Sequence, residues 1–212
     1  MKFYTGLYHA LLGRGLASDV NGAYPRNDGS VGQLPMKEGT PLYNIYNTDA
    51  AWGAQWNLSQ LWILAYPEYM SEYISSHLQA YKDAGWLADG LANNRYVSGV
   101  GTNLLSTIIA SAYECGIRDF DTKIAYEACL KNELEGKNRP FGAGKVNTTE
   151  FVKYGYVPHQ DAGEGYHDTF MFSASHTLEY SYSAWAVAQW AKQIGDDAHY
   201  SQLMDLSNGW ER

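Results

Sequence analysis

Three carboxylates near the C-terminal part of the sequence could act as an acid and base pair. Glu179 with Asp161, or Glu179 with Glu164, has the residue types that glycoside hydrolysis uses, one carboxylic acid and one carboxylate flanking the scissile bond. Sequence spacing does not fix the distance between them in space. The competing interpretation makes Glu179 an ordinary helix residue bonded to a backbone N–H or an arginine. We favour that interpretation and assign no catalytic residue.

Oxygen and imidazole groups that could bind a metal ion occur in three segments. Residues 159–168 hold two histidines and three carboxylates, but their spacing fits neither a His-x-x-x-His pair nor an EF-hand loop. Residues 19–22 (Asp-Val-Asn-Gly) and 27–29 (Asn-Asp-Gly) offer calcium ligands, yet ordinary turns require the same residues. A solvated loop and two turns are therefore the favoured interpretations, and no metal ligand is assigned.

Aromatic and sulfur side chains complete the set of chemically active groups. Flat faces on which a sugar ring could stack are supplied by Trp52, Trp56, Trp62 and Trp86, although tryptophan at helical spacing more often belongs to the core. We expect about one in three of them to face a pocket. Cys115 and Cys129 have no second cysteine or histidine at metal-ligand spacing, so we expect two buried thiols.

Composition limits the classes of protein and partner. The 212 residues are 45% apolar and carry a formal charge of −8, which fits one domain over residues 1–212. No run of Lys or Arg is long enough to follow a phosphate backbone, so nucleic acid is excluded as a partner. The longest apolar run, residues 61–66, is too short to span a membrane, and residues 1–6 lack the apolar core expected of a signal peptide. The compartment stays open.

Hydrophobic periodicity and glycine stops predict an all-α chain. The clearest helix has apolar residues at positions 70, 73, 74, 78 and 81 and a stop at Gly85. We expect a long irregular loop or small hairpin near residues 19–48, a polar connection at 132–149, and no strand elsewhere. Helical hairpins packed side by side, as in a solenoid or an α/α toroid, are the predicted architecture. The predicted helices are residues 3–13, 52–66, 67–84, 98–115, 121–131, 173–195 and 196–206.

An ordered series of short segments resembles glycoside hydrolase family 92, the calcium-dependent exo-α-mannosidases. The resemblance implies part of an (α/α)6 toroid, Ca²⁺ as the cofactor of the family, and a mannose-containing glycan as the partner. It favours an α-1,2-mannosidase-like enzyme. The segments are Leu7-Tyr8-His9-Ala10, residues 19–24, Tyr66-Pro67-Glu68, residues 81–87, 109–113, 116–121 and 125–128, Gly155-Tyr156-Val157-Pro158, and residues 177–195.

Two departures from the family pattern restrict what the resemblance implies. The family has a Trp-Asp-Thr-aromatic-Arg segment that holds the terminal mannose, whereas residues 52–56 here are Trp-Gly-Ala-Gln-Trp. Trp52 is therefore the expected sugar contact, with His9 second. The Glu-Gly-Asn motif of the general acid and the Gly-Asn-Asp/Glu-Asp motif of the base and calcium contacts follow Thr-Leu-Glu-Tyr in the family, and neither lies within residues 1–212. We expect neither turnover nor calcium binding from this chain alone.

Two other functions stay open. A non-catalytic carbohydrate-binding or interaction module would explain the missing Asp and Arg beside Trp52. A purely structural fragment would leave toroid faces exposed and self-associate through them.

Overall fold

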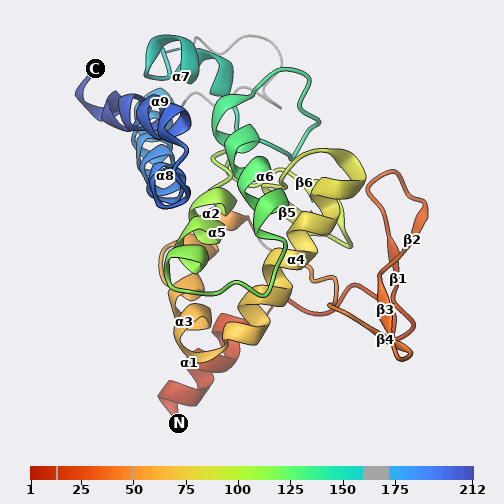
Figure 1. Cartoon of the computed structure of the whole chain (residues 1–212). Helices are drawn as coiled ribbons and strands as arrows, with labels where there is room; N and C mark the ends of the chain where they lie inside the picture. Colours follow the sequence, from red (N-terminus) through yellow and green to blue (C-terminus); the bar gives the residue numbers. More distant parts are fainter. Residues whose placement is uncertain (13, 49, 160–171) are drawn as a thin grey trace.

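The computed structural model describes residues 1–12, 14–48, 50–159 and 172–212, and this part of the chain is mostly helical (Figure 1). None of its helices is both long and apolar enough to cross a membrane. The helices are α1 (Lys2–Leu11), α2 (Ala51–Gln55), α3 (Leu58–Ala65), α4 (Pro67–Ala84), α5 (Leu105–Glu114), α6 (Thr122–Leu134), α7 (Thr148–Tyr154), α8 (Ser173–Ile194), α9 (Asp197–Ser207) and the 3-10 helix η1 (Asn208–Glu211). The strands are β1 (Ala23–Pro25), β2 (Val31–Gln33), β3 (Met36–Lys37), β4 (Thr40–Pro41), β5 (Gly90–Ala92) and β6 (Arg95–Val97).

The predicted helices with clear start and stop residues are confirmed. In α4, Pro67 occupies the first turn and Gly85 ends the helix with φ +80°, a left-handed conformation that glycine adopts without a Cβ penalty. In α8, Gly195 ends the helix in the same way with φ +79°. The Asp196 carboxylate then accepts a hydrogen bond from the His199 backbone N–H at 3.2 Å and caps α9.

The helices pack as neighbouring pairs around one principal core. α3 lies against α4, α5 against α6, and α8 against α9, while α8 also packs on α5 and α6. Figure 1 shows α8 and α9 side by side at one edge of the molecule. The core contains the fully buried rings of Trp62, Tyr73, Tyr180 and Trp190. Burying such rings removes much apolar surface from water and holds the pairs together.

Three two-stranded antiparallel hairpins accompany the helices. Two of them, β1–β2 and β3–β4, form the predicted excursion near residues 19–48, which extends beyond α4 in Figure 1. The third, β5–β6, was not expected, so the prediction of no strand outside this region is wrong. Its turn residues Asn93 and Asn94 both have positive φ, 50° and 55°, which is the geometry of a tight hairpin turn.

Four other expectations need correction. The helix expected from residue 98 begins only at Leu105, because Asn103 has φ 42° and residues 98–104 form a loop. The helix expected over residues 52–66 is divided into α2 and α3. The connection expected over residues 132–149 ends in an unforeseen helix, α7. Cys129 is buried as expected, but Cys115 is exposed because it follows the last turn of α5.

Candidate functional site

Trp52 lies at the surface where α2 meets α8. The residue is 39% exposed, and its indole Nε1–H donates a hydrogen bond to Glu179 Oε1 at 3.0 Å. The structure therefore brings together the predicted sugar-contact residue and the carboxylate that the sequence placed in the scaffold. Glu179 bonds neither to a backbone N–H nor to an arginine at this oxygen, but to an indole 127 residues away.

A second hydrogen bond joins the same two helices one turn further along. Gln55 Nε2 donates to the Tyr182 hydroxyl at 2.9 Å, again across 127 residues. Residues three apart on a helix share a face. The equal offset means that α2 and α8 run in the same direction along this contact. The two bonds form the interhelix ladder, defined by Trp52, Gln55, Glu179 and Tyr182.

Exposed rings surround the interhelix ladder. Trp56 packs edge-on to Trp52 with ring centroids 5.8 Å apart and an interplanar angle of 80°, and Trp56 as a residue is 55% exposed. By contrast, Trp62 and Trp86 are buried. Beyond Tyr182, a cavity of about 390 Å³ is lined by apolar side chains that include Leu178, Trp185 and Trp210. Half-exposed indoles of this kind offer flat apolar faces to the C–H groups of a ring-shaped ligand.

The N-terminal end of α2 is held by a buried carboxylate and the loop around it. Asp89 Oδ2 accepts hydrogen bonds from the Gly99 and Gly101 backbone N–H groups at 2.6 and 3.1 Å, and Oδ1 accepts one from Asn103 at 3.2 Å. The Asp89 carbonyl accepts from the Ala51 N–H at 2.8 Å. Burial raises the pKa of the Asp89 carboxyl, and the three N–H donors oppose that rise. Asp89 thus fixes both the 98–104 loop and the start of α2.

A buried ion pair is hydrogen-bonded to α8 on the side that faces the core. Lys145 Nζ lies 2.6 and 2.5 Å from the two carboxylate oxygens of Glu133, and both side chains are 1% exposed. The Ser183 hydroxyl donates to Glu133 at 2.7 Å and accepts from Lys145 at 2.8 Å, so the pair is attached to α8. Burial lowers the pKa of the Lys145 ammonium, while the Glu133 carboxylate opposes that shift.

Tyr180 connects α8 to two loops, the 98–104 loop and the connection between α6 and α7. Its hydroxyl donates to the carbonyls of Gly101 and Val146. Tyr180 follows Glu179 directly and Ser183 follows it by four residues, so the segment of α8 just after Glu179 is anchored at two residues.

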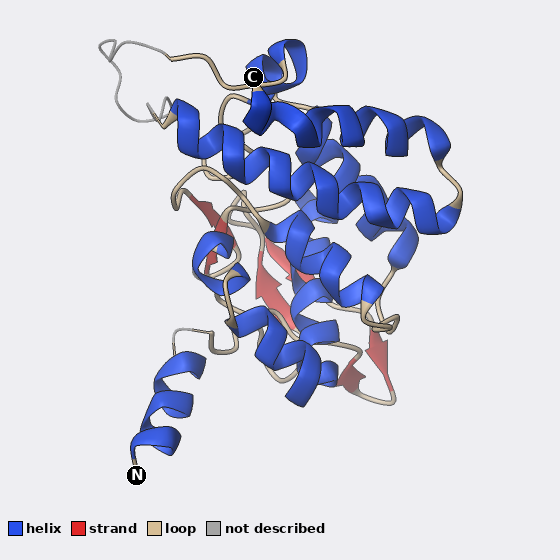
Figure 2. Cartoon of the chain, turned by 90° about the vertical axis from the view of Figure 1, so that its left-hand side faces the viewer, coloured by secondary structure: helices blue, strands red, loops and turns tan. Residues whose placement is uncertain are grey.

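The second predicted contact residue, His9, lies elsewhere. It is exposed near the end of α1, a helix without buried residues that projects from one end of the molecule (Figure 2). Its ring contacts Tyr8 at a centroid distance of 5.7 Å. Among the described contacts, none connects His9 with Trp52 or Glu179.

The carboxylate partners considered for Glu179 lie outside the described residues. Asp161 and Glu164 both belong to residues 160–171, as does most of the 159–168 segment. The turn interpretation of the two N-terminal segments is confirmed, because Asn21 Oδ1 accepts from the Ala23 N–H at 3.0 Å and Asp28 Oδ1 from the Ser30 N–H at 2.9 Å.

The described residues do not fit the calcium ion that the family resemblance implies. Within this part of the chain, no three His, Cys, Asp or Glu side chains gather around one point. Calcium takes six to eight oxygen ligands. The buried carboxylates of Asp89 and Glu133 already accept hydrogen bonds from N–H groups and an ammonium, respectively, so neither presents a free pair of oxygens.

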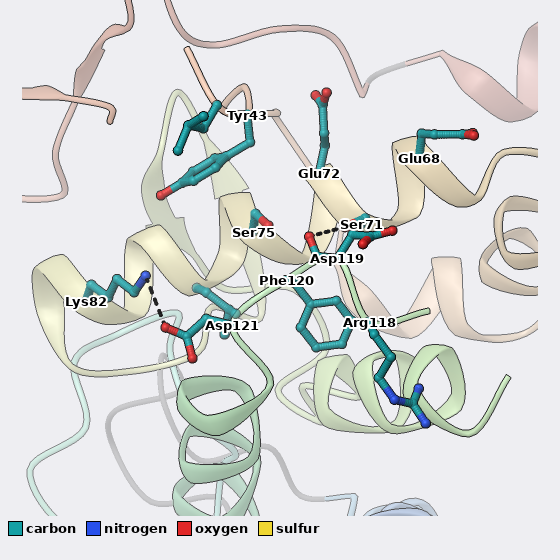
Figure 3. A pocket seen from close by; sticks show the side chains of 12 residues that line it. Tyr43, Glu68, Ser71, Glu72, Ser75, Lys82, Arg118, Asp119, Phe120 and Asp121 are labelled. Carbon is teal, nitrogen blue, oxygen red and sulfur yellow. Dashed lines mark hydrogen bonds and ion pairs between the residues drawn. The ribbon is translucent and has the colours of Figure 1, made fainter. Parts of the chain in front are cut away.

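A separate cavity of about 560 Å³ lies between α4 and the 117–121 loop (Figure 3). Several of its polar groups already have hydrogen-bond or ion-pair partners. Ser71 Oγ donates to the Asp119 carbonyl at 2.6 Å, Lys82 Nζ lies 3.9 Å from Asp121, and Glu72 accepts from the Tyr46 hydroxyl at 2.7 Å. Neither Trp52 nor Glu179 lines it.

Sequence reasoning missed the partners in this site. Gln55, Tyr182, Lys145 and Glu133 were not singled out, and Glu179 was read as part of the scaffold. The one available signal was the shared three-residue spacing of Trp52 with Gln55 and of Glu179 with Tyr182. That spacing gains meaning only when α2 and α8 are known to be neighbours.

Comparisons with known proteins agree on one family. A family model described as the glycosyl hydrolase family 92 catalytic domain matches residues 1–212. An uncharacterized secreted glycosidase of Arthroderma benhamiae is 30% identical over 156 residues, which cover 71% of this chain and 19% of the relative.

Solved structures share the fold. A family GH92 alpha-mannosidase of Bacteroides thetaiotaomicron in complex with mannoimidazole has a TM-score of 0.80 and 22% identity over 99% of this chain and 25% of its own. An inverting GH92 mannosidase of the same organism has a TM-score of 0.78 and 23% identity, over 99% and 27%. The chain thus spans between about a fifth and a quarter of the length of these relatives. The match over the whole chain shows that it belongs to glycosyl hydrolase family 92.

Proposed function

We propose that this region is part of the catalytic domain of an α-mannosidase-like glycoside hydrolase that acts on terminal mannose of glycans, with α-1,2-linked mannose as the preferred substrate. The observation that supports the site is the half-exposed Trp52 ring, held at the surface by Glu179 and flanked by Trp56. A mannose ring would stack its C–H face on this indole.

The side-by-side helix pairs would form part of an (α/α)6 toroid. Support comes from the packing of α3 on α4, α5 on α6 and α8 on α9, and from the TM-score of 0.80 with an α-mannosidase over 99% of this chain. The exposed apolar side chains of Leu178, Trp185 and Trp210 would then pack against further helices of the same domain. If these faces have no such partner in solution, the 212-residue chain self-associates, which sizing chromatography measures.

In this proposal the isolated chain binds but does not turn over. Glycoside inversion needs an acid and a base on opposite faces of the sugar. The region supplies one wall of the pocket, and the acid, base and calcium contacts belong to other parts of the catalytic domain.

The experiment is a titration of the purified 212-residue chain with methyl α-mannoside, followed by tryptophan fluorescence, together with an assay of aryl α-mannoside hydrolysis with and without Ca²⁺. We expect a fluorescence change that Trp52→Phe abolishes, and no hydrolysis. Calcium-dependent release of mannose would refute the proposal that the isolated chain lacks catalysis. Unchanged fluorescence would refute the proposal that the chain binds mannoside at Trp52. Trp62→Phe is not a suitable control because that ring is fully buried, whereas Trp210→Phe changes an exposed indole that lines the neighbouring cavity and makes no described contact with Trp52 or Glu179.

A second function, a non-catalytic carbohydrate-binding module, is favoured by one observation. Gly53 and Trp56 stand where the family has Asp and Arg, so two polar contacts to the sugar are missing. The distinguishing measurement is hydrolysis by the complete catalytic domain in which this region occurs. Binding without hydrolysis in that longer protein would support the module and contradict the enzyme.

A further inference from the structure

The interhelix ladder fixes the orientation of an exposed indole. A tryptophan side chain has one hydrogen-bond donor and no acceptor, so the Trp52 ring has one polar point of attachment. Glu179 Oε1 occupies that point at 3.0 Å. The other oxygen, Glu179 Oε2, is buried and has no hydrogen-bond partner within the described part of the chain. Within the described part of the chain, the hydrogen bond that the Glu179 carboxylate accepts comes from Trp52.

The acceptor itself stands on an immobilised segment of α8. Tyr180, the next residue, is fully buried and bonded to two backbone carbonyls, and Ser183 is bonded to the buried Lys145–Glu133 pair. A side chain whose own support is locked by packing and hydrogen bonds can hold another group in a defined place. Glu179 meets this condition.

Trp52 lies partly at the surface, at 39% exposure. Its aromatic neighbour is the edge-on ring of Trp56, a residue that is itself 55% exposed. A Cβ added at Gly53, the next residue, would meet no other atom within 4 Å, so the surface beside Trp52 is open there. The hydrogen bond to Glu179 occupies the single polar group of the indole and so restrains which face the ring presents.

We infer that Glu179 is a positioning residue that holds the Trp52 indole by its N–H so that one ring face stays open to ligand, with the Gln55–Tyr182 bond keeping α2 and α8 in register. Where the open face binds a mannose ring, an inference that rests on the proposed function, Glu179 sets the orientation of the stacking surface without contacting the reacting atoms. Preorganisation of a contact surface improves affinity because less freedom is lost on binding.

The test measures the Trp52 indole N–H directly. The chain has seven tryptophans, and the Trp52 indole resonance in a ¹H–¹⁵N spectrum is the one that Trp52→Phe removes. Three further variants are compared with the wild-type chain. Glu179→Ala removes the acceptor, Glu179→Gln keeps an oxygen acceptor of the same reach, and Glu114→Ala removes an exposed glutamate at the end of α5 as a matched control.

In Glu179→Ala we expect the Trp52 indole proton to shift upfield and to exchange with water about tenfold faster, as for loss of one hydrogen bond. Glu179→Gln should restore most of the protection, and Glu114→Ala should leave the resonance unchanged. A Trp52 resonance that is the same in Glu179→Ala as in the wild type overturns the inference. So does an equal response to Glu114→Ala, since that would reflect a general change in the fold.

Methyl α-mannoside separates this inference from the proposed function. The affinity of Glu179→Ala should fall by about tenfold, with Glu179→Gln close to the wild type. If the wild-type chain does not respond to mannoside while the indole resonance still depends on Glu179, the proposed function fails and the positioning role stands. If Glu179→Ala binds mannoside as tightly as the wild type, the positioning role fails and the proposed function stands.

Discussion

The buried Lys145–Glu133 pair permits a prediction about what holds α8 in place. Each side chain is 1% exposed, and the ammonium lies 2.5 Å from the nearer carboxylate oxygen. Removing one partner of a buried ion pair leaves an uncompensated charge and costs about 3–5 kcal/mol, against a total stability of about 5–15 kcal/mol for a typical domain. Glu133→Leu and Lys145→Met should therefore each lower the free energy of unfolding by about 3–5 kcal/mol.

The double variant distinguishes this electrostatic cost from a loss of packing. Glu133→Leu with Lys145→Met removes both charges and replaces them with apolar groups of similar volume, an exchange that is often neutral or stabilising. Hydroxyls of Ser106 and Ser183 lose an acceptor, which costs about 1 kcal/mol each. We expect the double variant to be within about 2 kcal/mol of the wild type, although the two single effects add to about 6–10 kcal/mol.

The assay is urea unfolding followed by circular dichroism for the wild type, both single variants and the double variant. At a slope of about 2 kcal/mol per molar urea, each single variant should lower the midpoint by about 1.5–2.5 M, and the double variant by about 1 M or less. A single variant too unstable to fold leaves the comparison intact if the double variant folds. A double variant that loses as much stability as the two singles combined would show that the charges are not coupled and would refute the reasoning.

Three further predictions follow from buried or open positions. Burial lowers the pKa of the fully buried His77 to about 3, so the folded state resists protonation that the unfolded chain accepts below about pH 6.5. Stability should fall as the pH drops from 6.5 towards 3, by about 2–3 kcal/mol at pH 4.5, and urea unfolding of His77→Leu should show that much less loss. Asp89→Ala leaves three backbone N–H groups without their carboxylate, so we expect a loss of about 3 kcal/mol and faster hydrogen exchange at Gly99 and Gly101, with Asp89→Asn intermediate. Unchanged exchange at those two amides would contradict this. Gly53→Asp meets open space and restores the acidic residue of the family segment, so methyl α-mannoside should bind about tenfold more tightly by fluorescence titration; equal or weaker binding would sink that prediction.

Local sequence signals predicted the helices well where the end signals were explicit. Pro67 and Gly85 bound α4, and Gly195 with Asp196 separates α8 from α9, because these residues act on their own backbone. The misses have local causes that compete with periodicity. Apolar residues at 100, 104 and 105 continue a helical stripe, yet Asn103 takes a left-handed φ and the loop bonds to Asp89 instead. Asn93 and Asn94 form a hairpin turn that the sequence shows only as two polar residues.

For the candidate site, the sequence singled out Trp52 as a sugar contact and supplied an ordered family resemblance, since both depend on residue type and order along the chain. It assigned Glu179 to the scaffold, and the structure places it on the Trp52 indole. The distance between Trp52 and Glu179, the pairing of Lys145 with Glu133, and the separation of His9 from both were decided by tertiary packing. Each depends on how helices distant in the sequence pack against each other. The hydrophobic period and residue spacing within one segment do not determine which other segment packs on it.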